Sequence, residues 1–357
     1  MTQLLDLPPA EAAEALGAWL AARGEPRYRL GQVTPRLWRR PLARWRDATD
    51  LPEQLREALD AEWPLARLEL EERRVSTDGT VKHLWRLPDG EAVESVLIPE
   101  RSRLTLCISS QAGCPLRCAF CATGSMGLAR DLAPWEIAGQ VRELLLAPEP
   151  VRPTNVVFMG MGEPLLNWPA VAVALTLLND AEALGIGARH ITVSTVGILP
   201  GLAELAKRPE QFGLAISLHG ATPEVRSRIV PVEKRYGLGD VMAALRAFSR
   251  RVTFEYVLIG GVNDRDEDLI ALAGLARKAG AMVNLLPLHP FAGAALRPTA
   301  PPRMRAFAAG LRERGVEAVL RRSRGLDIAA ACGQLRVARR AGAERREVPS
   351  EADGHID

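Results

Sequence analysis

The chain is poor in cysteine, in lysine and in long apolar runs, and each scarcity narrows what it can be. Its five cysteines in 357 residues are odd in number and clustered, which favours metal or redox chemistry over a disulfide framework. The longest apolar run, 170–178, falls short of the roughly 20 residues that a membrane helix needs. Acidic residues Asp6, Glu11 and Glu14 interrupt the start, which does not resemble a signal peptide. We therefore expect a globular, monomeric, cytoplasmic protein without a membrane segment.

Lysine supplies only four of the 46 positive charges, so arginine carries nearly all of them. A net charge of +3 is too small to establish a polyanionic partner, but the arginines are concentrated in two segments. Arginine binds phosphate through its planar fork, and interleaved aromatic residues can stack on bases. The alternative is a solvated helix face with Trp38 and Trp45 turned inward. The two segments contain Arg27, Arg29, Arg36, Arg39, Arg40, Arg44 and Arg46, and Arg321, Arg322, Arg324, Arg339 and Arg340.

The hydrophobic pattern divides the chain into four parts. Apolar residues at three- and four-residue spacing predict a small helical domain over 1–63. Short strand-like runs separated by Asp-Gly turns predict a β meander over 64–102, which links this domain to the next. From 103 to 337, β-rich runs alternate with longer amphipathic stretches. The tail, 338–357, is charged and alanine-rich, and we expect it to be disordered.

The alternating region predicts an α/β fold. Repeated strand–helix units pair their strands in parallel, and right-handed crossovers close such units into a barrel or an open arc. Chemistry in these folds lies at the carboxyl ends of the strands. Strands are expected at 104–109, 155–159, 190–195, 213–218, 252–258 and 282–288, with helices that include 134–146, 169–180, 238–250 and 266–279.

The spacing of Cys114, Cys118 and Cys121 is the most informative motif in the chain, and it directly follows the first expected barrel strand. Three thiolates are one ligand short of a closed zinc site and one short of a fully ligated iron–sulfur cube. An open position at a cluster iron can hold and reduce a small molecule. A structural zinc, with Cys107 or a distant histidine as fourth ligand, is the less favoured alternative because no second cysteine pair exists.

Polar residues also end the next three expected strands. Gly160 and Gly162 allow a close approach of the backbone to a ligand, and the neighbouring Glu163 carboxylate can hold an ammonium group. Ser194-Thr195 and Ser217-Leu218-His219 close the following two apolar runs. Each alone is typical of a helix cap or a satisfied core group. Together they predict a ring of polar groups on one face of one barrel.

Taken together, the motifs resemble the RlmN/Cfr family of radical S-adenosylmethionine enzymes, which methylate adenine in RNA. The similarity extends from about residue 20 to 337 and implies a partial (β/α)6 radical-SAM barrel. The distinguishing motifs, besides the cysteine spacing, are Thr105-Leu-Cys-Ile-Ser-Ser-Gln111, the 158–167 run with Gly162-Glu163-Pro164, Ser194-Thr195, 216–219, Ile229-Val230-Pro231 and Ala330-Ala-Cys-Gly-Gln-Leu335.

The resemblance implies two cofactors and assigns residues to them. A [4Fe-4S] cluster is expected on Cys114, Cys118 and Cys121, with its free iron chelating S-adenosyl-L-methionine. His289 stands where the family usually has an asparagine that contacts the cofactor, and a neutral histidine keeps one donor and one acceptor. The other expected cofactor contacts are Gly162, Glu163, Ser194, Ser217, Leu218 and His219.

The resemblance also implies roles for the two remaining cysteines. Cys332 matches the cysteine that carries the methyl group, and Cys107 matches the thiol that resolves a covalent RNA adduct by forming a disulfide with Cys332. Glu94 matches the family's proposed proton acceptor. Radical chemistry suits this target because adenine C2 is electron-poor and does not attack a sulfonium methyl group. The plain alternative for Cys107 and Cys332 is that each is an inert buried thiol. For Glu94 it is that the side chain is an exposed carboxylate on a strand.

The expected activity is methylation of C2 of an adenosine in 23S rRNA (adenosine-2503 type), with tRNA (adenosine-37 type) as a second substrate. The arginine-rich helical domain would dock the RNA, and a flavodoxin- or thioredoxin-like protein would reduce the cluster and the disulfide. Three alternatives remain open: C8 methylation of the same adenosine, a zinc-stabilised RNA-binding protein without catalysis, and a radical enzyme acting on a protein or small molecule.

Overall fold

The structure is a computed structural model that describes residues 3–291 and 295–335, so the expected disordered tail, 338–357, lies outside the described residues. No helix in this described part is long and apolar enough to cross a membrane. The helices are α1 (Pro9–Ala22), α2 (Tyr28–Val33), α3 (Glu53–Glu62), α4 (Ala122–Met126), α5 (Pro134–Leu145), α6 (Trp168–Asn179), α7 (Leu199–Ala206), α8 (Pro223–Ile229), α9 (Leu238–Ala244), α10 (Asp266–Ala279) and α11 (Pro301–Glu313). The strands are β1 (Glu69–Val75), β2 (Val81–Arg86), β3 (Ala92–Glu100), β4 (Arg103–Cys107), β5 (Gln111–Gly113), β6 (Leu128–Asp131), β7 (Asn155–Phe158), β8 (Ile191–Thr195), β9 (Gly213–Ser217), β10 (Thr253–Leu258), β11 (Met282–Pro287) and β12 (Ala318–Leu320).

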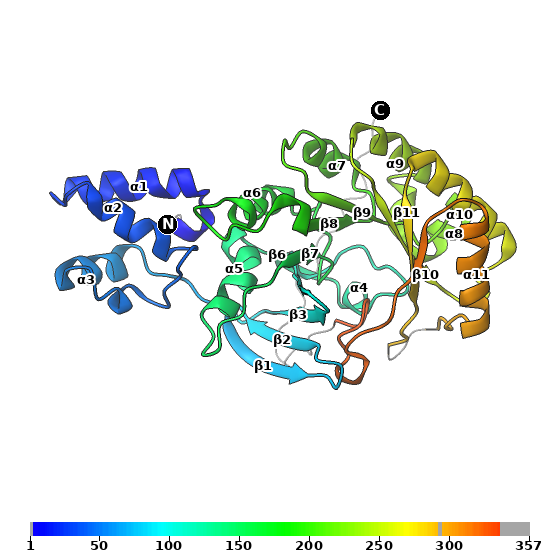
Figure 1. Ribbon diagram of the computed structural model, residues 1–357, viewed down its shortest axis with the longest axis horizontal. Helices are drawn as coiled ribbons and strands as arrows, with labels where there is room; N and C mark the ends of the chain where they lie inside the picture. The colour runs from blue at the N-terminus through cyan, green and yellow to red at the C-terminus, as the bar shows by residue number, and fades with distance from the viewer. Residues whose placement is uncertain (1–2, 292–294, 336–357) are drawn as a thin grey trace, which may run out of the picture.

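One sheet positions the whole site. Among the described residues it has ten strands in the order β1-β2-β3-β4-β7-β8-β9-β10-β11-β12. The pairs from β1 to β4 are antiparallel, whereas every pair from β4 to β12 is parallel. Figure 1 shows the sheet curving into an arc, with α7, α9, α10 and α11 outside it. The α/β partial barrel is confirmed, with all six expected strands present and the short β12 added at one edge.

Helix α10 illustrates why these segments pack as they do. Its first turn is capped because the Asp268 carboxylate accepts a hydrogen bond of 3.1 Å from the backbone N–H of Arg265. The helix ends at Gly280, whose φ of +60° is the left-handed conformation that glycine adopts without strain. Leu269, Leu272 and other residues at helical spacing are buried, so one apolar face covers the parallel strands.

The N-terminal helices α1, α2 and α3 form a lobe beside the arc (Figure 1). Trp38 and Trp45 are buried in its core, which is the inward orientation that the sequence left as an alternative, so neither ring is available for stacking on a base. Most arginines of this segment lie in ion pairs on the surface. These pairs are Arg29–Glu25, Arg36–Asp50, Arg39–Glu182, Arg44–Asp47 and Arg46–Asp60.

A buried arginine joins this lobe to the barrel. Arg142, on α5, donates to the backbone carbonyls of Leu37 at 2.9 Å and Leu42 at 2.6 Å. Burial lowers the pKa of Arg142 to about 10, so the guanidinium stays charged near neutral pH. The neighbouring Glu143 accepts from the Arg67 guanidinium at 2.6 Å, just before β1. Lobe, meander and barrel therefore meet at one turn of α5.

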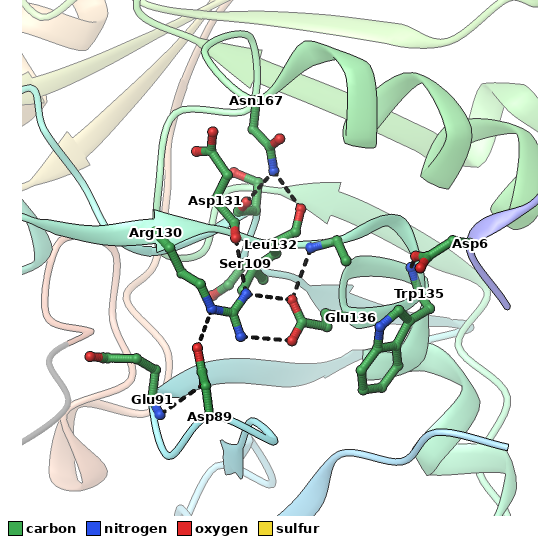
Figure 2. Close-up of polar contacts among 12 residues, drawn as sticks. Asp6, Asp89, Glu91, Ser109, Arg130, Asp131, Leu132, Trp135, Glu136 and Asn167 are labelled. Atoms are coloured by element: carbon green, nitrogen blue, oxygen red, sulfur yellow. Dashed lines mark hydrogen bonds and ion pairs between the residues drawn. The ribbon is translucent and has the colours of Figure 1, made fainter. Parts of the chain in front are cut away.

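The N-terminal end of α5 makes a second junction, drawn in Figure 2. Arg130, on β6, pairs with Glu136 of α5 at 2.7 Å and with Asp89 of the β2–β3 turn. Asn167 donates to the carbonyls of Ser110 and Leu132, both at 2.8 Å. These contacts fix the short β5–β6 sheet from which the cysteine motif departs.

We expect Arg142→Met to destabilise the docked lobe by about 2–4 kcal/mol, because two buried backbone carbonyls lose a charged donor. Chemical denaturation followed by tryptophan fluorescence reports on the lobe through Trp38 and Trp45. Arg39→Met is the matched control, since Arg39 is exposed and its ion pair with Glu182 is long at 3.4 Å. Equal unfolding midpoints for the two variants would contradict the assignment.

Candidate active site at the carboxyl edge of the parallel strands

The cysteine motif occupies the loop between β5 and α4. Gly113 begins it with a φ of +86°, and a Cβ there would lie 2.0 Å from the Gly127 carbonyl oxygen, so only glycine fits. The backbone N–H of Cys114 donates to that same oxygen at 3.0 Å, and the N–H of Ala119 donates to Ile229 O at 2.9 Å. The loop is therefore fixed by backbone contacts at its start and again within it.

The three thiols influence one another electrostatically. Burial raises the pKa of Cys114 to about 12, with the charge of Cys121 adding to the effect. Burial also raises the pKa of Cys118 well above its ordinary value, and Cys121, Cys114 and Glu163 raise it further. A set of close, buried thiols of this kind deprotonates together only when cations compensate the charge.

Among the described residues, no group of three or more histidine, cysteine, aspartate or glutamate side chains is placed to hold a single metal ion. Ligands of an iron–sulfur cube bind different irons and need not converge on one point.

Gly160 and Gly162 bring the backbone that follows β7 against the backbone that follows β4. A Cβ on Gly160 would lie 2.6 Å from the Ile108 carbonyl oxygen. Gly162 has a φ of +101°, and a Cβ there would lie 2.6 Å from the Cβ of Gln111. The glycines are thus required by the packing of this edge, in addition to any contact with a ligand.

Glu163 is the buried acid at this edge. Its carboxylate accepts hydrogen bonds from the backbone N–H groups of Leu165 at 3.0 Å and Val196 at 2.9 Å. Burial raises the pKa of Glu163 to about 7, even though these donors act in the opposite direction. A cationic ligand beside Glu163 would restore the ionised form near neutral pH.

The ends of β8 and β9 bring the predicted serines and histidine together. The hydroxyls of Ser194 and Ser217 lie 3.2 Å apart. His219 accepts a hydrogen bond of 3.1 Å at Nδ1 from the N–H of Val257, and its ring meets the edge of Phe120 with centroids 4.4 Å apart. Burial lowers the pKa of His219 to about 3, so this imidazole is neutral. The side chain of Leu218 is fully buried and apolar, so only its backbone could make a polar contact with a ligand.

Cys107 and Cys332 lie near each other although 225 positions separate them in the sequence. Cys107 ends β4 and is buried, which raises the pKa of its thiol, and the charge of Cys332 raises it further. Cys332 is a free cysteine whose residue as a whole is exposed, and burial of its thiol raises the thiol pKa, with the charge of Glu255 adding to the effect. The loop that carries Cys332 contacts the end of the cysteine motif, where the N–H of Ala122 donates to the carbonyl oxygen of Gly333 at 2.8 Å.

The remaining two predicted residues lie on either side of this loop. Glu94, on β3, is buried and forms an ion pair of 2.9 Å with Lys82 on β2, which differs from the exposed carboxylate of the plain alternative. His289 follows β11, and its Nε2 lies 2.6 Å from the Ser323 hydroxyl. Burial lowers the pKa of His289, which favours the neutral ring.

Several supporting residues escaped the sequence analysis. Arg226, on α8, is fully buried, and its guanidinium bonds the carbonyls of Leu218 and Val196, tying β9 to β8. Glu255, inside β10, accepts from Asn284 of β11 at 2.8 Å. A charged residue within an apolar strand pattern was the available signal for Glu255, whereas nothing in the sequence marks Arg226 as buried.

The sequence signature of the radical SAM superfamily matches residues 108–273. A protein of Gemmatimonas aurantiaca described as a probable dual-specificity RNA methyltransferase RlmN is 56% identical over 99% of this chain and 98% of its own. The dual-specificity RNA methyltransferase RlmN of Anaeromyxobacter dehalogenans is 44% identical over 96% of this chain and 94% of its own. A crystal structure of a radical SAM methyltransferase from Sphaerobacter thermophilus superposes with a TM-score of 0.87, at 42% identity, over 94% and 99% of the two chains.

We expect Gly162→Ala to unfold the edge that carries Glu163, at a cost of about 3 kcal/mol or more, because the added methyl group meets Gln111. Gly24→Ala is the matched control, since Gly24 has a φ of +73° but open space around its Cα, so only the backbone strain of about 1 kcal/mol applies. Thermal unfolding of both variants measures the difference, and equal shifts would show that contact with Gln111 is unimportant.

Proposed function

Because this chain belongs to the RlmN family of radical S-adenosylmethionine RNA methyltransferases, we propose that it methylates C2 of adenosine in both 23S rRNA and tRNA. The observation that carries this proposal is the pair of thiols outside the cysteine motif. A radical enzyme acting on a protein or a small molecule has no need of Cys107 and Cys332, whereas a covalent RNA adduct requires one thiol to form it and another to release it. We propose that the enzyme acts as a cytoplasmic monomer.

The enzyme uses a [4Fe-4S] cluster and S-adenosyl-L-methionine. The residues present fit both groups. The mutually coupled thiols of Cys114, Cys118 and Cys121 are the donor set that a cube with one open iron requires. When bound, the cofactor supplies a methyl group and, from a second molecule, a radical.

We assign Glu163 to the cofactor's ammonium group, because it is a buried carboxylate held by two backbone donors, and its charge acts on the Cys118 thiol of the cysteine motif. The Ser194–Ser217 hydroxyl pair, neutral His219 and the backbone at Gly162 and Leu218 supply the polar rim around it. His289 is assigned a further cofactor contact. Its bond to Ser323 fixes the ring, so it replaces the usual asparagine with an oriented imidazole.

Cys332 is assigned to carry the methyl group, since it is a free, exposed cysteine in a loop bonded to the cysteine motif. After the methylene carbon on Cys332 has bonded to adenine C2, Glu94 accepts the proton that C2 loses. Loss of this proton also releases one electron, which the oxidised cluster would accept. Cys107 then attacks the sulfur of Cys332, so that the S–S bond forms, the bond between that sulfur and the methylene carbon breaks, and the methylene carbon takes up the thiol proton to become the methyl group of the released RNA. Burial keeps the Cys107 thiol protonated and inert until the adduct is in place.

The RNA must present its target base unstacked, because an enzyme cannot reach the ring atoms of a base that is stacked and paired in a helix. The arginines of the N-terminal lobe are the proposed docking surface. Their exposed ion pairs contribute little to stability, so phosphates can displace the carboxylates. A flavodoxin- or thioredoxin-like reductant is proposed for the cluster and the Cys107–Cys332 disulfide.

Binding of S-adenosylmethionine should depend on the ionisation of Glu163. Its raised pKa of about 7 means that the carboxyl is neutral at lower pH and cannot pair with an ammonium group. We expect the affinity of the cluster-loaded enzyme to fall by about tenfold for each pH unit below 7. Calorimetric titration measures this, and Glu163→Gln should bind weakly with no such slope. A flat profile for the wild type would contradict the assignment of Glu163.

Cys107→Ala should accumulate RNA covalently attached to the protein, because the thiol that releases the adduct is gone. Cys332→Ala should form no adduct and no methylated RNA. Denaturing gels detect the adduct, and mass mapping of the RNA fragment distinguishes 2-methyl from 8-methyl adenosine. Iron content near four per chain in both variants would show that the cluster is intact. Methylation by Cys332→Ala at the wild-type level, or an exclusively 8-methyl product, would refute the proposal.

A further inference from the structure

Lys82 is one of only four lysines in the chain, and it lies in β2 with 7% of its surface exposed. A buried ammonium group is costly unless its hydrogen atoms are bonded and its charge is compensated. Two acceptors are close: Glu94 Oε1 at 2.9 Å and the backbone carbonyl of Ala329 at 3.2 Å. The same ammonium therefore touches a proposed catalytic carboxylate and the loop of a proposed catalytic thiol.

The contact with Glu94 follows from the strand register. Lys82 lies opposite Val96, and Leu84 lies opposite Glu94, so Lys82 and Glu94 are diagonal neighbours on one face of the β2–β3 pair. Both side chains are buried there, and both are on strands fixed by ladder hydrogen bonds. The position of the ammonium is set by the meander, independently of the loop it reaches.

The contact with Ala329 holds a strained point of the loop 325–335, which we call the Cys332 loop. Ala329 has a φ of +50°, a conformation that costs a residue other than glycine about 1 kcal/mol or more. Two residues that precede Ala329 also bind this loop to the rest of the protein. Asp327 accepts from the Ser76 hydroxyl at 2.5 Å and from the N–H of Thr77 at 3.1 Å, and Gly325 N–H donates to Asp78 at 3.0 Å.

Among the residues that hold the Cys332 loop, Lys82 differs because it also contacts Glu94. The bonds of Asp327 and Asp78 join the loop to the β1–β2 turn and reach no residue of the proposed chemistry. Lys82 bonds the loop three positions before Cys332 and at the same time bonds Glu94. Asp327 therefore provides a natural comparison, because it fixes the same loop without contacting the carboxylate.

We propose that Lys82 is a positioning residue that joins the Glu94 carboxylate to the Cys332 loop, so that proton acceptor and methyl carrier keep a fixed mutual position. The ammonium holds the Glu94 carboxylate through an ion pair of 2.9 Å, and it holds the backbone carbonyl of Ala329, three positions before Cys332. This inference rests on the proposed roles of Glu94 and Cys332.

The first test needs neither cofactor nor RNA. Hydrogen–deuterium exchange of peptides from the Cys332 loop should be roughly tenfold faster in Lys82→Met than in the wild type, because a charge-assisted hydrogen bond is lost. Asp327→Asn should also accelerate exchange there, since it weakens another anchor. Lys82→Arg should protect the loop better than Lys82→Met does. Unchanged exchange in Lys82→Met would overturn the proposed hold on the loop.

The second test asks whether Lys82 acts through Glu94. Glu94→Gln should form the covalent RNA adduct and retain it, with released product reduced roughly tenfold. Lys82→Met should form less adduct, because the Cys332 loop is loosened, and should retain what it forms in the same way. The double variant leaves no unpaired buried charge from this pair, so it should fold, and its release should match that of Glu94→Gln alone. Asp327→Asn should form less adduct but release what it forms. Lys82→Met that behaves like Asp327→Asn, or like the wild type, would overturn the link to Glu94.

Cys107→Ala, measured in the same assay, distinguishes a failure of the proposed function from a failure of the proposed role of Lys82. If it accumulates no adduct, the proposed function fails, and the exchange measurements still decide whether Lys82 holds the Cys332 loop. If it accumulates adduct while Lys82→Met releases RNA normally, the function stands and the role of Lys82 is refuted.

Discussion

The ten-stranded sheet curves into an open arc, whose concave side is accessible between its two edges. In this protein the Cys332 loop, and not a further strand, covers that opening. The Cys332 loop spans the interval between the β1–β2 turn and the cysteine motif, bonded to Ser76 and Lys82 on one side and to Ala122 and Thr123 on the other. Every proposed chemical role depends on this closure. It brings the carrier thiol to the carboxyl edge of the parallel strands, which alone could not position it.

Buried charged side chains, most of them arginines, join segments of this molecule by hydrogen bonds to backbone carbonyls. Arg142 bonds the backbone carbonyls of Leu37, Leu42 and Ala66, and Arg226 bonds those of Leu218 and Val196, which a planar guanidinium with several donors can do. Arginine abundance is therefore a poor measure of surface available to RNA. The same principle explains why a lysine stands out at position 82, where a single compact charge fits between one carboxylate and one carbonyl.

The sequence predicted repeating features better than isolated ones. Helix α10 was predicted at the bounds it has, because its apolar positions recur over fourteen residues and glycine ends it. Strand β12 was missed because three residues carry no measurable alternation. The cysteine motif and Gly162-Glu163 were found from spacing. Lys82 and Arg226 were not, because burial of a charge depends on partners distant in sequence, and a lone charged residue usually lies at the surface.

The closing loop also has a consequence for how the molecule folds. The hydroxyl of Ser76 and the carboxylate of Asp327 are 251 positions apart, so their bond closes a very long loop of chain at a cost in entropy. Contacts between such distant segments slow the folding of a domain. Attachment of the Cys332 loop to the β1–β2 turn therefore depends on the fold of the chain between them and not on local structure.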